Sequence, residues 1–499
     1  MELAPSFGLL NYTVLSVYLV AMIAMGIVTA GSQKTTTDYF LAGRRMPWLA
    51  VAMSVFATIT SAVSYLGVPG LAYSENVSFL VGILMMPVVA PFIITLFLPF
   101  YRKLNVTTSY EYIYRRFGTA ARYTVSGLFI LARLGWLGTV IYAPALALSV
   151  VTGMPVWLAI LLMGMLATAY TVLGGLAAVI WTDVAQFLVL SVGAVITAVA
   201  LLTTVPHGFT GIMSVAAESG RLNLLEWRPK LAEMTVAVVA VSYFFNFLHD
   251  YGVDQVTVQR LLATNSYAGM ARATALNAVF TVAIMSLLAF IGLGLFAYYQ
   301  AYPGTLPHGV AGDRIFPYYI VHALPAGVSG LVITGIFAAA MSSMDSGINS
   351  LSTVVVTDFV RPLRRAATRE TSDVRLARLL TLIFGVFATA VAFYAATLGS
   401  ILAAAQSFLG LFSGPVLALF LLGILTKRGT YYGWLVGIMV AIPLTVWIQL
   451  DTNVHFIYYF PLTFLVSLGL GYLVSLPMKP GSNVKELTLQ RNDPTQDTV

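Results

Sequence analysis

The chain contains no cysteine and very few charged residues. Asp, Glu, Lys and Arg make up 9% of its 499 residues, against roughly 25% in an ordinary soluble domain. Without cysteine there is no disulfide framework, no thiolate metal site and no cysteine nucleophile. The five histidines are scattered and form no nucleophile or metal constellation, so an enzymatic function is unsupported. No organic cofactor is expected.

Apolar sequence is what the chain has in abundance. Hydrophobic residues make up 59% of it, together with 41 Gly and 21 Pro, a composition typical of helices packed in lipid. A helix needs about 17 to 25 apolar residues to cross the hydrocarbon core. Segments of that length predict an all-α polytopic membrane protein with about 13 transmembrane helices, the ninth preceded by a short loop helix. They lie at 8–30, 47–70, 77–100, 121–151, 155–173, 177–204, 233–259, 273–299, 316–358, 376–397, 400–425, 431–449 and 455–476.

The distribution of Lys and Arg predicts the orientation. Cytoplasmic loops retain basic residues, and an external N-terminus places 21 of the 26 Lys and Arg residues, Arg260 among them, on the cytoplasmic side. Four lie outside, and Arg133 falls within a span. The net charge of +7 therefore has an explanation that needs no nucleic acid. We expect a protein of the plasma (inner) membrane with its C-terminus in the cytoplasm, surrounded by lipid and with no obligatory protein partner.

Two of the spans look interrupted. The second places Thr58, Thr60, Ser61 and Ser64 in mid-membrane, and the seventh contains the polar run from Asn246 to Gln255. Transporters bind solute where broken helices expose backbone groups near the midplane. Counting each interrupted span as the first of five predicts two repeats. The division is 1–46 (first helix and cytoplasmic loop), 47–204 (first repeat), 205–232 (extracellular loop), 233–425 (second repeat), 426–478 (two C-terminal helices) and 479–499 (disordered cytoplasmic tail).

Carboxylates inside spans are functional candidates, because lipid penalises an unpaired charge by several kcal/mol. Asp345 shares one helix face with Ser342, Ser346 and Asn349, at spacings of three and four residues. A face of hydroxyls and one carboxylate suits a monovalent cation, although a hydrogen-bonded packing seam has the same pattern. Asp183 is either a cation ligand or a helix cap, because Gln186 follows three residues later.

Three further charged or titratable residues lie within spans. His249 and Asp250 could contact solute, relay a proton or face a water-filled vestibule. Arg133 could bind an anionic solute, pair with an acid or extend to the interface.

Several motifs resemble those of the sodium:solute symporter family. The most specific are "GGLAAVIWTDVAQ", "DQVTVQR" and "FAAAMSSMDSGINS", supported by "TDYFLAGRRMPWLAVAMSVFAT" and "TSYEYIYRRFG". "VIYAPALAL" followed by "TG" is most similar to the branch of monocarboxylate, iodide and multivitamin symporters, and bacterial sialic-acid symporters are also similar. The resemblance implies a LeuT-like fold with a five-plus-five inverted repeat and additional flanking helices.

The resemblance also implies where sodium binds. A principal site would use backbone carbonyls and hydroxyls from Ala57, Thr60, Ala339, Ser342 and Ser343. A second site, present in some members, would use Asp183, Ser342, Asp345 and Ser346. Position 345 departs from the hydroxyl of many members, and its carboxylate would either strengthen that site or bind a proton. One coupling sodium, or two, is therefore expected.

The same resemblance implies a solute site beside the two interruptions. Its members would be Ser61, Ser64, Tyr65, Phe79, Trp136, Asn246 and Phe247. Sialic-acid members carry an arginine where this chain has Trp136 and a glutamine where it has Ile83. Both departures weaken a sialic-acid assignment, whereas Ser61 and Ser64 match the short hydroxyl residues of that site.

These features predict a sodium-coupled secondary active symporter that imports a small organic solute by alternating access. A carboxylate-bearing solute is favoured, either a monocarboxylate or a sugar acid such as sialic acid. A neutral sugar or vitamin is the alternative solute, and a proton is the alternative coupling ion because Asp345, His249 and Asp250 could titrate. An ion channel would need a continuous polar pore, whereas the polar residues here cluster beside two breaks.

Overall fold

The structure, a computed structural model, describes residues 7–30, 35–223, 235–307, 310, 312–363, 370–397, 401–479 and 487–489. Within these ranges the regular elements are helices, and the only β-type pairing is one isolated bridge between Met46 and Thr264. Residues 480–486 and 490–499 of the predicted tail, and 224–232 of the predicted extracellular loop, lie outside the described residues.

Nine described helical stretches are long and apolar enough to cross a membrane. Six are single helices: α1 (Leu9–Ala30), α9 (Thr119–Thr152), α11 (Leu176–Thr204), α15 (Tyr267–Ala301), α19 (Glu370–Ala395) and α21 (Tyr431–Asp451). Three are composite. α5 (Leu80–Ile83), α6 (Met85–Phe92) and α7 (Leu98–Leu104) form one, α17 (Val328–Val354) with α18 (Arg361–Leu363) forms the second, and η6 (Phe456–Tyr458) with α22 (Tyr459–Ser475) forms the third.

Two further spans are bent pairs of helices. α3 (Trp48–Ile59) meets α4 (Ala62–Ser74) at 61°, and α13 (Val236–Gly252) meets α14 (Gln255–Leu262) at 47°. The count is then up to 11 in the described part of the chain. Two more helices, α10 (Val156–Gly174) and α20 (Ile401–Leu425), occupy predicted spans, so the number 13 stays a prediction.

Both breaks have a local cause. After α3 the backbone becomes extended at Ser61, whose hydroxyl accepts a hydrogen bond from the amide of Val63 and so caps α4. Asp254 likewise caps α14, because its Oδ1 accepts from the amide of Val256 at 2.8 Å. Ser and Asp are favoured at this position, where they satisfy amides that the first turn leaves free. The predicted interruptions of the second and seventh spans are confirmed.

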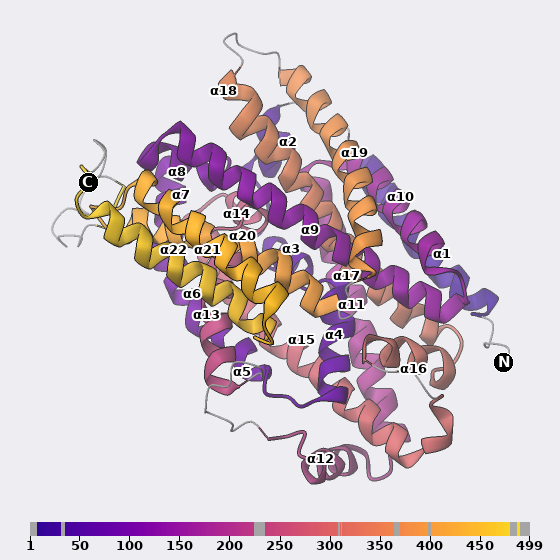
Figure 1. Cartoon of the computed structure of the whole chain (residues 1–499). Coiled ribbons are helices and arrows are strands. Elements are labelled where there is room, and N and C mark those ends of the chain that lie inside the picture. Colours follow the sequence, from indigo (N-terminus) through magenta and orange to yellow (C-terminus); the bar gives the residue numbers. More distant parts are fainter. Residues whose placement is uncertain are drawn as a thin grey trace.

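The most buried long helix is α17, and it holds the centre of the bundle. It packs against α11, α9, α3 and α1, and its serines from Ser342 to Ser352 are fully buried. Figure 1 shows α9, α20 and α22 crossing the front of the molecule, with α3 and α17 behind them. The expected short helix before this span is α16 (Ile315–Ala323).

α10 (Val156–Gly174) and α19 make the same glycine–threonine contact in both directions. α10 contains Gly-Met-Leu-Ala-Thr at 164–168, and α19 contains Gly-Val-Phe-Ala-Thr at 385–389. A Cβ on Gly164 would lie 2.1 Å from Oγ1 of Thr389, and a Cβ on Gly385 would lie 2.1 Å from Oγ1 of Thr168. The two helices are therefore antiparallel here and approach closely because each supplies a glycine to the other's threonine.

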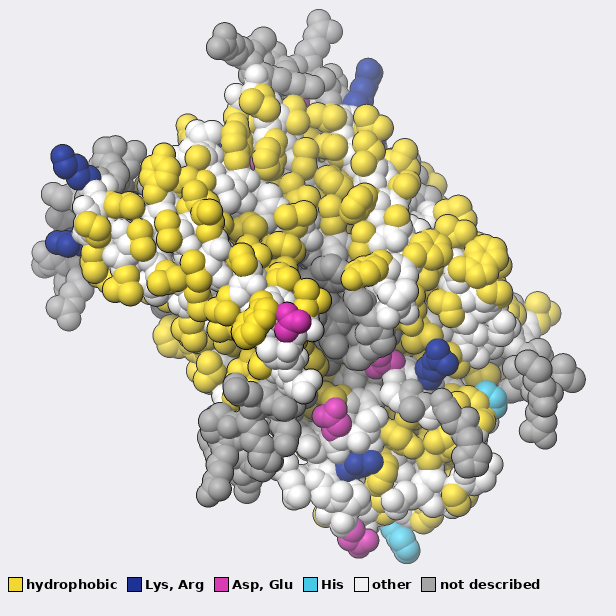
Figure 2. Space-filling view, viewed as in Figure 1, with side chains coloured by type: hydrophobic (Ala, Val, Ile, Leu, Met, Phe, Trp, Pro, Cys, Tyr) yellow, Lys and Arg dark blue, Asp and Glu magenta, His cyan; other side chains and the backbone are white. Residues whose placement is uncertain are grey.

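The surface matches a protein that lies in lipid. Hydrophobic side chains cover the upper part of the face seen in Figure 2, whereas charged side chains lie at its top and left edges and in its lower part. One expectation about the charges is wrong: Arg260, counted with the cytoplasmic surface, is 0% exposed. Its helix, α14, follows the break and turns back into the bundle, so a charge near the end of a predicted span lies inside the protein.

Candidate functional site

Two serines of α17 reach the carboxyl end of α3. The hydroxyl of Ser342 donates to the carbonyls of Ala57 at 2.7 Å and Ala339 at 3.1 Å, and Ser343 donates to the carbonyl of Thr58 at 2.7 Å. These groups are fully buried. Four of the five residues predicted for the principal sodium site therefore meet, and the fifth, Thr60, follows α3 directly and lines the adjacent cavity.

The chemistry of this cluster suits a monovalent cation. The carbonyls of Ala57 and Thr58 belong to the last turn of α3, where carbonyls have no amide partner four residues on and carry the negative end of the helix dipole. The hydroxyls of Ser342 and Ser343 add further neutral oxygens, and both donate to backbone carbonyls and not to a carboxylate. Neutral oxygens from a broken helix are the ligands that sodium has in transporters of this type.

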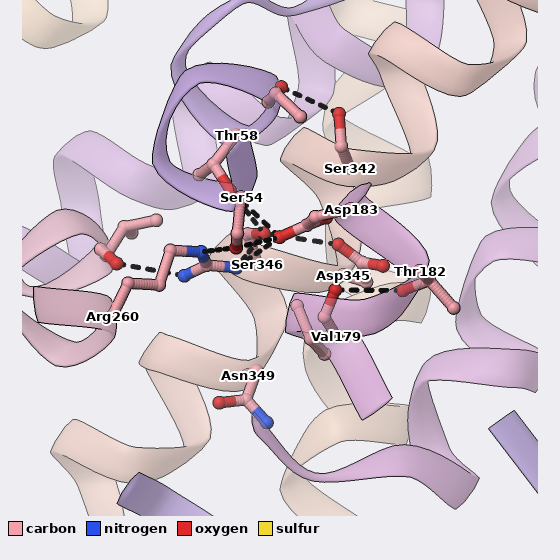
Figure 3. A network of polar contacts seen from close by, with 12 residues as sticks. Ser54, Thr58, Val179, Thr182, Asp183, Arg260, Ser342, Asp345, Ser346 and Asn349 are labelled. Atoms are coloured by element: carbon pink, nitrogen blue, oxygen red, sulfur yellow. Dashed lines mark hydrogen bonds and ion pairs between the residues drawn. The ribbon is translucent and has the colours of Figure 1, made fainter. Parts of the chain in front are cut away.

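A charged cluster lies beside this site, about one turn earlier on α3, at Ser54, and one turn later on α17, at Ser346 (Figure 3). Oδ2 of Asp183 accepts hydrogen bonds from Ser54 at 2.5 Å and Thr58 at 3.3 Å, and the guanidinium of Arg260 lies 3.3 Å from the same oxygen. Arg260 also donates to Ser54 at 3.0 Å and to the hydroxyl of Ser346. Asp183 and Arg260 are both 0% exposed, so this ion pair is dry.

Asp345 adds a second carboxylate to this cluster. Its Oδ1 accepts from the hydroxyl of Ser346 at 3.2 Å, and Ser346 lies 2.9 Å from Thr58. Two buried oxygens, Oδ1 of Asp183 and Oδ2 of Asp345, have no hydrogen-bond partner among the described residues. With both carboxylates ionised, the one guanidinium would leave an excess of one negative charge. The four residues predicted for the second sodium site thus lie on α11 and on one face of α17.

The alternative interpretation of Asp183 as a helix cap is wrong. α11 begins at Leu176 after Gly175, which places Asp183 in its third turn. Gln186, the proposed capping partner, has both side-chain polar atoms without a hydrogen bond in the described structure. Asp183 therefore faces the interior of the bundle.

A cavity of about 140 Å³ opens beside the first break. It is lined by both broken spans, by α9 and by the short helix η6 (Phe456–Tyr458). Six of the seven residues predicted to contact solute line it: Ser61, Ser64, Phe79, Trp136, Asn246 and Phe247. Tyr65 is the exception, because it is fully buried and its hydroxyl donates to the carbonyl of Leu190 at 3.0 Å, away from the cavity.

A histidine caps the short helix η6 at one wall of the cavity. His455 caps η6 by accepting a hydrogen bond from the amide of Ile457 at 3.3 Å. Burial lowers the pKa of His455 below its usual value, which keeps the ring unprotonated and able to accept. Phe456 and Ile457 are thereby held at the cavity wall.

The charged residues of the predicted spans form two separate pairs beside the cavity. Arg133 lines the cavity, lies over the ring of Trp136 with its Cζ 4.6 Å from the centroid, and pairs with Asp254. Asp250 also lines the cavity and bonds to Nδ1 of His249 at 2.9 Å. His249 itself is 3% exposed and packs against Phe460. Of the alternatives for Arg133, pairing with an acid is the one observed.

Two residues of the "DQVTVQR" motif were not predicted to be part of a site. Arg260 binds Asp183, and the amide of Gln259 donates to the carbonyl of Phe40 at 2.8 Å and to Asn349 at 3.1 Å. Both are 0% exposed. The density of polar residues after the second break was the available signal, since a polar run of this kind inside a span requires internal partners.

Comparison with known proteins places this geometry in a family. Residues 39–441 match the family model described as "Sodium:solute symporter family". A sodium/sialic acid symporter of Aliivibrio fischeri is 33% identical over 489 residues, covering 97% of this chain and 96% of that protein. Human sodium-coupled monocarboxylate transporter 1 is 33% identical over 460 residues, covering 90% of this chain and 75% of that protein.

A solved structure has the same fold. It is described as the substrate-bound outward-open state of a Na+-coupled sialic acid symporter, and it matches with a TM-score of 0.90 at 32% identity. The match covers 96% of this chain and all of that one. The expected all-α, LeuT-like architecture is confirmed, and these relatives are transporters rather than enzymes.

Proposed function

This chain belongs to the sodium:solute symporter family and is a sodium-coupled symporter, and from this premise we propose that it imports a small carboxylate-bearing solute by alternating access. Inward movement of one positive charge across 100 mV supplies about 2.3 kcal/mol. One sodium per cycle is enough to drive uptake, and a second would drive it further.

One observation carries the proposed coupling mechanism. The carbonyls of Ala57 and Thr58, to which Ser342 and Ser343 donate, come directly before the break that lines the solute cavity at Thr60 and Ser61. A sodium ion bound there would join α3 to α17 and fix the backbone that forms the cavity wall. Ion and solute would then stabilise the same conformation, which is the requirement for coupling.

The second cation site is proposed at Asp183, Ser342, Asp345 and Ser346. Its support is that two carboxylates share a cluster with one guanidinium and that two carboxylate oxygens are left without partners in the described structure. A monovalent cation there would lie between α11 and α17, the two helices that carry these residues.

The five-plus-five repeat, 47–204 and 233–425, is also a proposal. In this division α10 is the fourth helix of the first repeat and α19 is the fourth of the second. Their shared Gly-x-x-Ala-Thr sequence and antiparallel contact are what an inverted repeat requires of equivalent helices. The two broken helices, each the first of its repeat, face each other across the cavity.

The solute class rests on the cavity. Serine and threonine hydroxyls, the amide of Asn246, the guanidinium of Arg133 and the carboxylate of Asp250 line it among aromatic residues. Its volume of about 140 Å³ is below the range of about 300–1,000 Å³ for drug-sized ligands, which favours a compact monocarboxylate over a bulky sugar acid. Trp136 and Ile83, which both line the cavity, also distinguish it from a sialic-acid site.

The proposal is tested with purified protein in proteoliposomes. We expect an inward sodium gradient to drive uptake of a labelled monocarboxylate such as pyruvate, and a potassium gradient of equal size to drive none. Thermal unfolding in sodium and in potassium, with pyruvate, sialic acid, glucose and biotin, identifies the solute class because a ligand of the folded state raises its stability. Stabilisation by acid pH and by no sodium-dependent ligand would contradict sodium coupling.

The external N-terminus and cytoplasmic C-terminus can be tested because the chain has no cysteine. Single cysteines at the exposed positions Ser219 and Lys427 would be the only thiols. An impermeant maleimide added to intact cells is expected to label Ser219→Cys at once and Lys427→Cys only after permeabilisation. The reverse pattern would invert the orientation.

A further inference from the structure

A buried arginine, Arg133, lines the cavity. It lies on α9 and is 5% exposed. Its Nε has no hydrogen-bond partner among the described residues. The guanidinium lies over Trp136, which orients its plane. A guanidinium offers five donors in a planar fork that fits the two oxygens of a carboxylate, so this one has donor capacity that the protein leaves unused.

The present partner of Arg133 is held from another direction as well. Asp254 binds Arg133 through Oδ2, while its Oδ1 caps α14 by accepting from the amide of Val256. The positive end of the α14 dipole also favours the carboxylate. Asp254 therefore keeps a hydrogen bond and a favourable field when Arg133 turns away, whereas Arg133 has no second acidic partner in the described part of the chain.

Burial determines what can replace Asp254. The side chains of the pair are 6% and 3% exposed, and a buried charge that loses its partner is strongly destabilising. A neutral solute in the cavity would leave Arg133 uncompensated, so it cannot displace Asp254. A solute carboxylate can, because the guanidinium then exchanges one anion for another.

We propose that Arg133 is the anion receptor of the cavity and that the solute carboxylate takes the place of Asp254 on its guanidinium. This inference rests on the proposed function, and it names the group that selects acids over neutral solutes. The exchange also releases the break between α13 and α14 from α9. Solute binding would therefore loosen a contact between two helices that line the cavity, which links recognition to movement.

The test compares acids with their uncharged esters. Binding of pyruvate and methyl pyruvate, and of sialic acid and its methyl ester, is measured calorimetrically in sodium with protein in nanodiscs. The main variant is Arg133→Gln with Asp254→Asn, which replaces the ion pair by two amides and keeps a residue suited to cap α14. The matched control is Arg122→Gln with Asp358→Asn, a second buried Arg–Asp pair of α9 that does not line the cavity.

The unmodified chain and the control pair are expected to bind the acid about tenfold or more tightly than its ester, since a charge-assisted bidentate contact is lost in the ester. The Arg133/Asp254 double variant is expected to lose that preference and to bind the ester as before. Asp254→Asn alone is expected to tighten acid binding several-fold, because the competing carboxylate is gone.

The outcomes separate this inference from the proposed function. If no acid binds the unmodified chain in sodium, the carboxylate assignment fails and this inference fails with it. If the acid preference persists in the double variant, Arg133 is not the receptor although the proposed function stands. Weaker acid binding in Asp254→Asn would show that Asp254 supports the solute instead of competing with it, which also overturns the exchange.

Discussion

The two broken spans are built from different chemistry. At the break between α3 and α4 the groups that meet are neutral, namely backbone carbonyls, the α17 hydroxyls and the capping hydroxyl of Ser61. The break between α13 and α14 carries the carboxylate of Asp254, an ion pair to Arg133 and, two turns on, Arg260 bound to Asp183. Each break nevertheless has a side-chain cap on the helix that follows it.

This difference separates two tasks. A neutral set of oxygens can bind and release a monovalent cation, because it has no net charge of its own to hold the ion permanently. Charged groups buried as pairs hold the second break in place through partners on α9, α11 and α17. Both broken spans line the cavity. A solute there would therefore contact the break whose carbonyls can bind the ion and also the break that ion pairs hold in place.

The strongest test of the charged break is Arg260→Met. Removing this guanidinium leaves Asp183 and Asp345 in a dry cluster without a cation, and we expect a loss of at least about 3–5 kcal/mol of stability. Thermal unfolding in potassium measures it, and sodium is expected to restore part of the loss by binding the carboxylates. Arg102→Met, at an exposed arginine, is the control. Equal, small effects of both variants would show that the cluster does not need its internal charge.

A direct comparison of the two caps follows. Asp254→Ala removes both a cap and the partner of buried Arg133, so the expected loss is about 3–5 kcal/mol. Ser61→Ala removes only a neutral cap, worth about 1 kcal/mol. Unfolding of both variants in potassium, without solute, isolates the structural effect. Losses of similar size would mean that the ion pair adds little at the second break.

Run length and polar interruptions were enough to predict up to 11 spans of the described part of the chain, and both breaks. Apolar stretches of this length are typical of membrane spans, and clusters of hydroxyls or acids marked the breaks, whereas α4 continues through Pro69. The spans and breaks depend on a few neighbouring residues. The contact of Ser342 and Ser343 with α3 joins residues 285 positions apart, and it was predicted only because the serine motif of α17 and the end of α3 both resemble family sequences.

Contacts set by helix rotation or by distant partners were not predictable. Arg133 pairs with a residue 121 positions away, and Arg260 with one 77 positions away. Counting charges by loop assigned Arg260 to the surface, because the rule does not see that α14 turns inward after a bend of 47°. Tyr65 follows Ser64 directly, yet one lines the cavity and the other does not, since adjacent residues on a helix point about 100° apart.

Substitutions at the neutral break should change stability less than those at the charged break, and they should act mainly on sodium affinity. Ser342→Ala and Ser343→Ala each remove one hydroxyl beside the α3 carbonyls, and we expect sodium affinity to fall about tenfold, or about 1.4 kcal/mol. The sodium dependence of pyruvate uptake measures it. Ser352→Ala is the matched control, because its hydroxyl is equally buried on α17 but donates only to the carbonyl of Asn349 in its own helix. Equal sodium affinity in all three variants would remove the principal site from this break.

The smallest effect is expected just beyond the neutral break, at two adjacent residues of α4. Tyr65→Phe deletes a buried hydrogen bond to Leu190 and should lower stability by about 1 kcal/mol while leaving the dissociation constant of the solute unchanged. Ser64→Ala, at the cavity wall, should do the opposite, with little change in unfolding and weaker solute binding. Thermal unfolding and calorimetry on both variants decide between them. If Tyr65→Phe weakened solute binding as Ser64→Ala does, the α4 helix would have to rotate during transport, and the neutral break would be the moving one of the two.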